Sequence, residues 1–160
     1  MKVSEAVGRL LVERGVRQVF GLIGSGNFDI TLAMIDAGAS FAASRHEGGA
    51  ITMTDAFGRV SGEVAACSVH QGPGLTNTMT GLTEAAKSRT PLLLLAPETA
   101  AAAVHSNFRI DQEALVKSVG AGVARVRRRS SGTESVIRVA APGEMALTVT
   151  PYFARALAAE

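Results

Sequence analysis

Short apolar segments alternate with amphipathic segments along much of the chain. Four apolar runs have the length expected of buried strands, and each ends in glycine or polar residues. These runs are residues 18–23, 40–44, 64–69 and 92–96. Before and between them, apolar positions recur at helical spacing, as they do at Ala6, Val7, Leu10 and Leu11. This alternation predicts a parallel sheet with helices packed on both of its faces.

The last part of the chain is less regular. Residues 122–126 and 145–150 predict two further strands. We therefore expect an α/β fold with a doubly wound, mostly parallel sheet of about six strands. Only residues 134–140 are left for a helix between the last two strands. Such a connection is shorter than parallel strands usually require.

The composition narrows the class of protein. The chain has 160 residues, 47% of them apolar and 19% charged, with a formal net charge of +2, which fits one domain over residues 1–160. We expect neither a nucleic-acid partner nor a membrane partner, because the charge is weak and no apolar run approaches about 20 residues. Cys67 is the only cysteine, so an intrachain disulfide is excluded and a cytoplasmic location is expected. Its apolar surroundings predict a small buried core residue.

An acidic residue stands where a predicted strand passes into a glycine-led helix. The strand is residues 40–44, the helix is residues 48–61, and Glu47 lies between them. Ligands of open α/β sheets bind at the carboxyl ends of strands, which favours a cofactor contact for Glu47. The alternative is a purely local role, since acidic residues are common in the first turn of helices for dipole reasons.

Two glycine-rich loops follow other predicted strands. One contains Gly24 and Ser25, and the other contains Gly72, Pro73 and Gly74. Loops with little side-chain bulk let a flat ring or a phosphate approach the backbone, and the N–H groups at a helix start provide donors. We therefore expect the carboxyl ends of three strands to bring the two loops and the acidic residue together.

The order of these motifs resembles the pyrimidine-binding domain of thiamine diphosphate enzymes, in the acetolactate synthase and benzoylformate decarboxylase group. The similar segments are, in chain order, Phe20-Gly21 with Gly24, Arg45-His46-Glu47, Ala56-Phe57-Gly58-Arg59, Gly72-Pro73-Gly74 with Thr76-Asn77, and Gly81-Leu82 through Pro91. The similarity covers about residues 1–120 and is looser beyond them. It implies thiamine diphosphate as the cofactor and a 2-oxo acid as the substrate.

The resemblance implies a catalytic role for Glu47. In this family the matching glutamate hydrogen-bonds the N1′ nitrogen of the cofactor's aminopyrimidine and favours an imino tautomer, which removes the proton from thiazolium C2. That role needs a carboxyl group that can share a proton with a ring nitrogen. Burial beside an apolar ring disfavours the charged form and raises the proton affinity of such a group.

The same resemblance implies further site residues. Several benzoylformate-type decarboxylases carry a histidine that faces the substrate at the position of His70, which makes His70 a second catalytic candidate. The residues implied to surround the cofactor are Glu47, Gly24, Ser25, Gly72, Pro73, Gly74 and Asn77. Ser25 would contact the substrate carboxylate, and Asn77 would orient Glu47. The alternatives are a histidine that caps a backbone group, a turn serine and an asparagine that supports the helix start.

Three nearby residues stay outside the predicted site. His46 is expected to have a structural role, because neighbours on an extended segment point in opposite directions. Phe108 and Gln112 lie where family members place an aromatic residue and a glutamine near the reaction centre of the partner subunit. Their spacing here departs from the usual adjacent pair.

One part of the family's site has no counterpart in the sequence. In the family, the diphosphate and its Mg²⁺ are held by a second domain with a Gly-Asp-Gly segment, and this chain contains no such segment. We therefore expect no metal ligands here, a diphosphate-binding domain or subunit as partner, and an exposed apolar face where that partner docks. A homo-oligomer is expected as well.

The function that we expect is the cofactor-activating half of a thiamine diphosphate-dependent 2-oxo acid decarboxylase or carboligase, inactive by itself. Two alternatives remain open. One is a non-catalytic dimerising or regulatory domain of such an enzyme. The other is an unrelated doubly wound domain that binds a nucleotide or phosphate through its glycine loops.

Overall fold

A six-stranded sheet forms the centre of the molecule. The computed structural model describes residues 2–100, 102–126 and 145–149. The strand order is β2-β1-β3-β4-β6-β5. The strands are β1 (Gln18–Gly21), β2 (Ser40–Ala43), β3 (Ala65–Ser68), β4 (Leu92–Pro97), β5 (Gly122–Val126) and β6 (Met145–Val149). The first four are parallel to one another, and β6 and β5 continue the sheet in antiparallel pairing. The prediction of a mostly parallel sheet of about six strands is confirmed.

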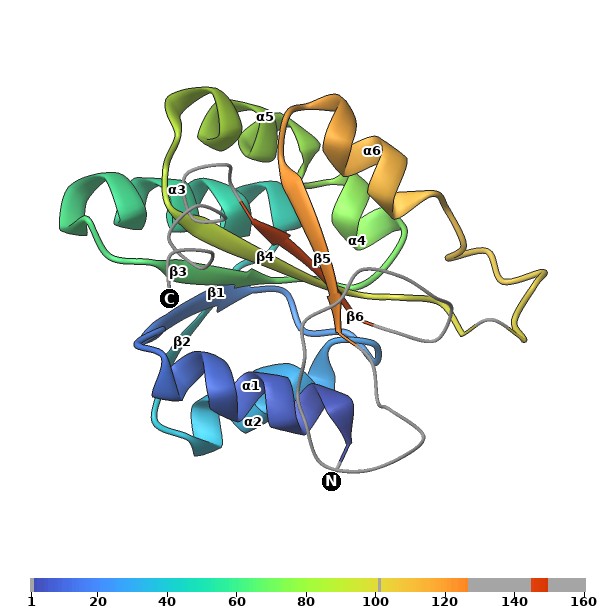
Figure 1. Cartoon of the computed structure of the whole chain (residues 1–160), viewed down its shortest axis with the longest axis horizontal. Helices are drawn as coiled ribbons and strands as arrows, with labels where there is room; N and C mark the ends of the chain where they lie inside the picture. Colours follow the sequence, from blue (N-terminus) through green and yellow to red (C-terminus); the bar gives the residue numbers. More distant parts are fainter. Residues whose placement is uncertain (1, 101, 127–144, 150–160) are drawn as a thin grey trace.

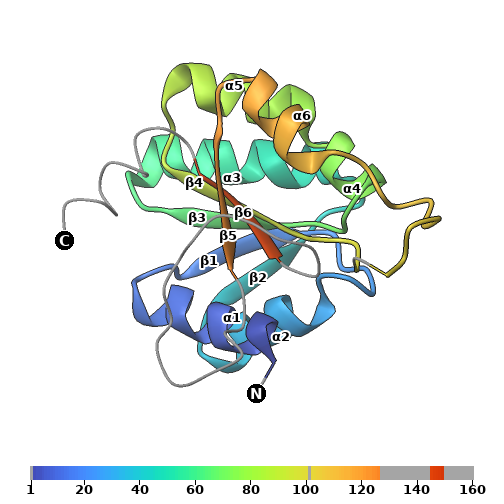
Figure 2. The ribbon, with the colours of Figure 1, turned by 45° about the vertical axis from the view of Figure 1, so that its right-hand side comes forward.

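Helices cover both faces of the sheet, as predicted. The helices are α1 (Val3–Glu13), α2 (Phe28–Asp36), α3 (Glu47–Ser61), α4 (Pro73–Thr76), α5 (Met79–Ser88) and α6 (Gln112–Ser118). Helices α1 and α2 lie side by side on one face, and α3, α4, α5 and α6 lie on the other (Figures 1 and 2). The protein is therefore a three-layer α/β structure.

Strand β4 shows how the sequence divides the core between these layers. Leu93 and Leu95 belong to the apolar cluster that includes residues of α1 and α2, whereas Leu92 and Leu94 belong to the cluster under α3 and α5. Successive side chains of a strand point to opposite faces, so a run of leucines supplies both clusters. All four leucines are at most 1% exposed, which is the burial expected of a central parallel strand.

The last two strands do not need the helical crossover that a parallel sheet would require between them. Strands β5 and β6 pair in antiparallel fashion, with Gly122 opposite Val149 and Val126 opposite Met145. Antiparallel strands need no crossover helix, so the sequence between them does not have to supply one. Both strands were predicted, and both are confirmed. The predicted helix at residues 134–140 lies outside the described residues.

Two local features differ from the sequence-based expectation. The predicted helix after Gly72 is divided into α4 and α5, with Asn77 at the end of the first. Helix α6 was not predicted, although Asp111 provides the N-cap that marks its start and accepts a hydrogen bond from the Ala114 N–H at 2.9 Å. A seven-residue helix contributes too short a periodic pattern to stand out in the sequence.

The order of the strands defines where a ligand site is expected. The chain passes from β1 to β2 on one side and then from β3 to β4 on the other, so the direction of winding reverses between β1 and β3. In doubly wound sheets the loops diverge at this point and leave a crevice at the carboxyl ends of the strands. The loops after β1 and β3 are the two glycine-rich loops.

Candidate functional site

Glu47 is the first residue of α3 and lies at the carboxyl end of β2. It is only 9% exposed, which is unusual for a glutamate. Its Oε2 accepts a hydrogen bond from Asn77 Nδ2 at 2.9 Å. Among the described residues, no donor forms a hydrogen bond with the other carboxylate oxygen, Oε1. One oxygen is thus fixed by the protein, and the second remains available to another group.

His46 defines how α3 begins. Its Nδ1 accepts a hydrogen bond from the Gly48 N–H at 3.0 Å, so the imidazole is the N-cap of the helix. The hydroxyl of Ser44 donates to the His46 carbonyl oxygen at 2.6 Å and fixes the residue before the helix. The structural role expected for His46 is confirmed by these contacts, which direct Glu47 inward.

Cys67 of β3 lies in the apolar cluster that includes Ala50 and Ile51 of α3. It is fully buried, as the sequence predicts, and burial raises the pKa of its thiol to about 12. A hydrogen bond with Thr54 opposes this rise in pKa, and the nearby charge of Glu47 adds to it. The thiol is therefore protonated at neutral pH and serves as a packing group rather than a nucleophile.

His70 follows β3 and contacts the loop after β1. Its Nδ1 donates to the carbonyl oxygen of Gln71 at 2.9 Å, because a carbonyl can only accept. Its Nε2 lies 3.4 Å from Ser25 Oγ. The ring of Phe108 packs against the imidazole, with ring centroids 4.8 Å apart and planes tilted by 60°. The histidine is thus held on three sides.

The glycines of the two loops allow this close approach. A Cβ added at Gly24 would lie 2.8 Å from His70 Cδ2, a distance that real side chains do not adopt. A Cβ added at Gly74 would lie 3.1 Å from His70 Cβ and 3.5 Å from Glu47 Oε1. The structure therefore brings the loop after β1, the start of α3 and the loop after β3 together, as the sequence predicts.

A buried polar network supports the loop after β1, and sequence reasoning missed it. Asn27 Oδ1 accepts from the Gly24 N–H at 2.8 Å, and Asn27 Nδ2 donates to Ser68 Oγ at 3.0 Å. The hydroxyl of Thr31 lies 2.7 Å from the same Ser68 Oγ. Asn27, Thr31 and Ser68 are each 0% exposed. The sequence did contain a signal for this network, namely polar side chains within an apolar helix and an apolar strand. Such side chains need hydrogen-bond partners when they are buried.

Gln112 is a further residue that the sequence-based site omitted. Its side chain is buried, and its Oε1 accepts a hydrogen bond from the Gly72 N–H at 3.1 Å. Phe108 was omitted as well, because its spacing from Gln112 departs from the usual adjacent pair. In the structure its ring packs on His70. Both residues reach the loop after β3 because the chain bends before α6. Their spacing in the sequence does not reveal this bend.

An apolar stripe is exposed beside the loop after β1. Phe28, Leu32 and Ile35 of α2 are 49%, 42% and 37% exposed, and Ile23 in the loop is 44% exposed. The helical spacing of four and three residues places the first three on one face of α2. The side chains of α2 in this group form one exposed apolar face of the helix.

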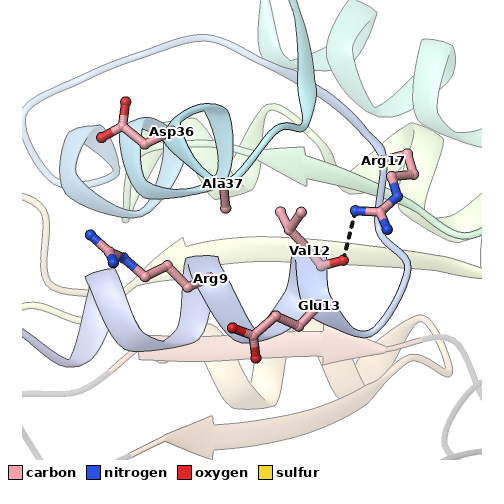
Figure 3. A pocket seen from close by; sticks show the side chains of 6 residues that line it. All are labelled: Arg9, Val12, Glu13, Arg17, Asp36 and Ala37. Carbon is pink, nitrogen blue, oxygen red and sulfur yellow. Dashed lines mark hydrogen bonds between the residues drawn. The ribbon is translucent and has the colours of Figure 1, made fainter.

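A hollow of about 450 Å³ lies elsewhere, between α1 and α2 (Figure 3). It is lined by Arg9, Val12, Glu13, Arg17, Asp36 and Ala37. Both helices end here, just before the amino ends of β1 and β2. The hollow is therefore at the opposite end of the strands from Glu47 and His70, and it is separate from the candidate site.

Two further properties concern the described part of the chain only. Among those residues, no group of three or more His, Cys, Asp or Glu side chains is arranged to hold a metal ion. None of the described helices has both the length and the apolar character needed to cross a membrane.

Comparison with known proteins identifies the class to which this fold and site belong. The family model described as "Thiamine pyrophosphate enzyme, N-terminal TPP binding domain" matches residues 1–118. The chain therefore belongs to the thiamine pyrophosphate enzyme family, as an N-terminal TPP binding domain. Membership implies the use of thiamine diphosphate, and enzymes of this family typically have partner domains and oligomerise.

Relatives of several activities are similar to the chain. Acetolactate synthase isozyme 3 large subunit of Escherichia coli is 39% identical over 98 residues, which cover 61% of this chain and 17% of the relative. Sulfoacetaldehyde acetyltransferase of Castellaniella defragrans is 36% identical over 98 residues, which cover 61% of this chain and 16% of the relative. Human 2-hydroxyacyl-CoA lyase 2 is 38% identical over 92 residues, which cover 58% of this chain and 15% of the relative. The matched segment thus spans less than a fifth of the length of each relative.

Proposed function

We propose that this domain is the cofactor-activating half of a thiamine diphosphate-dependent decarboxylase or carboligase that acts on a 2-oxo acid. The observation that carries the proposal is the environment of Glu47. The carboxyl group is buried at the carboxyl end of the sheet, one of its oxygens is held by Asn77, and no donor from the described residues bonds to the other.

Glu47 has the properties needed to share a proton with a ring nitrogen of the cofactor. Asn77 restricts rotation of the carboxyl group, so Oε1 keeps one direction. Gly74 leaves the space next to Oε1 without a side chain. When bound, the cofactor supplies the carbanion chemistry, and the protein supplies orientation and proton transfer. A carboxyl group in this position acts as the general acid–base group of the activation step.

His70 and Ser25 form the proposed substrate end of the site. In the neutral imidazole, Nδ1 carries the proton that is donated to Gln71, so Nε2 accepts and faces the Ser25 hydroxyl. The serine is exposed and can turn its hydroxyl toward a substrate carboxylate. We assign His70 to proton transfer or carboxylate binding at the 2-oxo acid, and Gly24, Gly72 and Pro73 to the walls next to the cofactor.

The proposal includes a partner that completes the site. The sequence contains no Gly-Asp-Gly segment, so we assign the diphosphate group and its Mg²⁺ to a diphosphate-binding domain or subunit. The exposed stripe of Phe28, Leu32 and Ile35 supports a docked partner in a homo-oligomeric enzyme, because an apolar face on a helix is stabilised by coverage. By the same proposal, the domain spans residues 1–160 and functions in the cytoplasm.

The relatives leave the substrate open, since their names cover a synthase, an acetyltransferase and a lyase. A phosphate-binding role for the glycine loops is disfavoured by Glu47, because a carboxylate next to an anion is repulsive.

The experiment that tests the proposal is the exchange of the C2 proton of thiamine diphosphate, measured by NMR in the chain combined with its diphosphate-binding domain. We expect Glu47→Gln to lower the exchange rate at least about 100-fold, which is the usual contribution of a general acid–base group. Glu63→Gln is the matched control, because Glu63 is exposed in the turn after α3. Unchanged exchange in Glu47→Gln would refute the role.

A second measurement separates catalysis from regulation. The combined enzyme should convert 2-oxo acids, whereas a dimerising or regulatory domain would bind its partner without any turnover. Recovery of the complex with no turnover of any 2-oxo acid therefore argues for the regulatory alternative.

A further inference from the structure

One peptide unit links Gln112 to the candidate histidine. We propose that Gln112 is a positioning residue that sets the tautomer of His70 by fixing the plane of the Gln71–Gly72 peptide bond. The inference rests on the proposed role of His70, but its first test does not depend on catalysis.

The Gln71–Gly72 peptide is hydrogen-bonded at both of its polar atoms. Its carbonyl oxygen, which belongs to Gln71, accepts from His70 Nδ1 at 2.9 Å. Its N–H, which belongs to Gly72, donates to Gln112 Oε1 at 3.1 Å. The C=O and N–H of a trans peptide point in opposite directions in one rigid plane. Rotation of this plane therefore breaks both bonds together.

Gln112 is well suited to hold this plane. Its side chain is 4% exposed, and its Nε2 donates to the carbonyl oxygen of Pro97 at 2.9 Å. The amide group is thus anchored to the end of β4, and only its oxygen is directed at Gly72. A buried side-chain amide bonded at both ends loses little by staying in one rotamer, since rotation leaves buried polar groups unpaired.

The loop has no bulky side chain to fix its path without this contact. Gly72 has a φ of +64°, and the next residue is Pro73, which has no N–H to donate. The Gly72 N–H is therefore the last backbone donor before α4. The backbone of Phe108 lies directly over Gly72, where a Cβ would meet the Phe108 carbonyl oxygen at 2.6 Å.

The orientation of the plane determines which nitrogen of His70 carries the proton. With the Gln71 carbonyl directed at Nδ1, that nitrogen is the donor, and Nε2 of the neutral ring is an acceptor toward Ser25. If the plane rotates, an N–H group replaces the carbonyl near Nδ1 and disfavours a proton there. The tautomer with the proton on Nε2 is then favoured, and the acceptor that faces Ser25 is lost.

The first test measures the tautomer of the neutral His70 ring by ¹⁵N NMR in the full chain. We expect mostly the Nδ1–H form in the unmodified chain and mostly the Nε2–H form in Gln112→Met, which has a similar volume but no amide. The control is Val116→Ala, which removes methyl groups of the same helix from the core and changes an apolar side chain that forms no hydrogen bond with Gly72 or His70. A folded Gln112→Met chain with an unchanged tautomer, or an equal change in Val116→Ala, would overturn the proposal.

The unmodified chain also tests the proposal, so the test does not depend on whether Gln112→Met folds. Its Gly72 amide should exchange with solvent at least tenfold more slowly than the amide of the exposed residue Ser25. Its His70 should be in the Nδ1–H form. An Nε2–H histidine in this chain contradicts the proposal.

A second test uses the enzyme completed by its diphosphate-binding domain. Gln112→Met should lower turnover of the 2-oxo acid at least tenfold and slow C2 proton exchange much less, because the carboxyl group of Glu47 is held by Asn77 and not by Gln112. Unchanged turnover would contradict the positioning role. Failure of Glu47→Gln to affect exchange would instead refute the proposed cofactor activation, so the two failures are distinguishable.

Discussion

The side-chain amide of Asn77 donates a hydrogen bond to Glu47 Oε2 at 2.9 Å, across 30 residues of sequence. The two residues come from different elements: Glu47 begins α3, and Asn77 ends α4. This bond connects the carboxyl group to the end of α4. It is the contact that gives the buried carboxylate a fixed direction.

Loss of this bond should be measurable as a loss of stability. We expect Asn77→Ala to lower the free energy of unfolding by about 1–2 kcal/mol, because a hydrogen bond to a charged group is removed. Asn77→Asp should lower it at least as much, because the replaced amide no longer donates to Oε2 and a second carboxyl group faces Glu47. Urea unfolding at pH 7 checks both. An unchanged free energy of unfolding in both variants would contradict this contact.

Gly72 should tolerate a side chain much less well than a glycine with the same sign of φ elsewhere. Gly38 has a φ of +103° but no atom within 4 Å of an added Cβ, whereas at Gly72 the Cβ would meet backbone atoms of Phe108. Gly38→Ala should cost about 1–2 kcal/mol, from backbone strain alone. Gly72→Ala should cost at least about 1 kcal/mol more, because overpacking adds to the strain. The measurement is the difference in unfolding free energy, and similar values at both sites would show that Phe108 is not packed over the loop.

Glu98 should make stability fall as pH rises above the ordinary glutamate range. Burial raises the pKa of Glu98 above 4.5, although the charge of Arg125 opposes this rise. The folded state then binds the proton more tightly than the unfolded state, so stability is lost as pH rises from about 4.5 through the folded pKa. Glu98→Gln should remove this loss. Arg125 keeps a partner in the variant, because Glu113 Oε2 lies 3.1 Å from its guanidinium.

Glu84 provides a control of opposite sign for the Glu98 measurement. Hydrogen bonds from Arg59 and Ser88 lower the pKa of Glu84, so its contribution is present above about 4.5 and is lost as pH falls through the folded pKa. Urea unfolding across pH 3 to 8 gives the free energy of unfolding of Glu98→Gln, Glu84→Gln and the unmodified chain. Relative to the unmodified chain, Glu98→Gln should become more stable as pH rises, and Glu84→Gln should become less stable. Parallel profiles would contradict the burial of Glu98.

Cys67 should resist modification while the protein is folded. With a pKa of about 12 and complete burial, its thiolate is scarce at pH 8 and is out of reach of reagents. We expect iodoacetamide to label the folded chain at least about 1,000-fold more slowly than the chain in urea. Mass spectrometry over time gives both rates. Rapid labelling of the folded chain would mean that β3 is not in the centre of the sheet.

The sequence was sufficient to predict the layers of the fold and the position of Glu47. Four apolar runs separated by helical patterns leave few arrangements other than a parallel sheet covered on both faces. A residue that follows a strand directly, as Glu47 follows β2, is then placed at the carboxyl edge by chain connectivity alone. The contacts of His70 with Ser25 and of Glu47 with Asn77 lie at the strand ends where the motifs predicted them.

Only the tertiary structure decided which polar groups support the site. Asn27 and Thr31 meet Ser68 because the start of α2 lies against the carboxyl end of β3. Gln112 reaches Gly72 because the chain bends back before α6. The antiparallel pairing of β5 and β6 is a similar case, since pairing direction depends on the whole sheet. Local patterns report which face of an element is buried. Hydrogen bonds between distant side chains depend on how the elements are placed, and that placement is fixed by packing of the entire core.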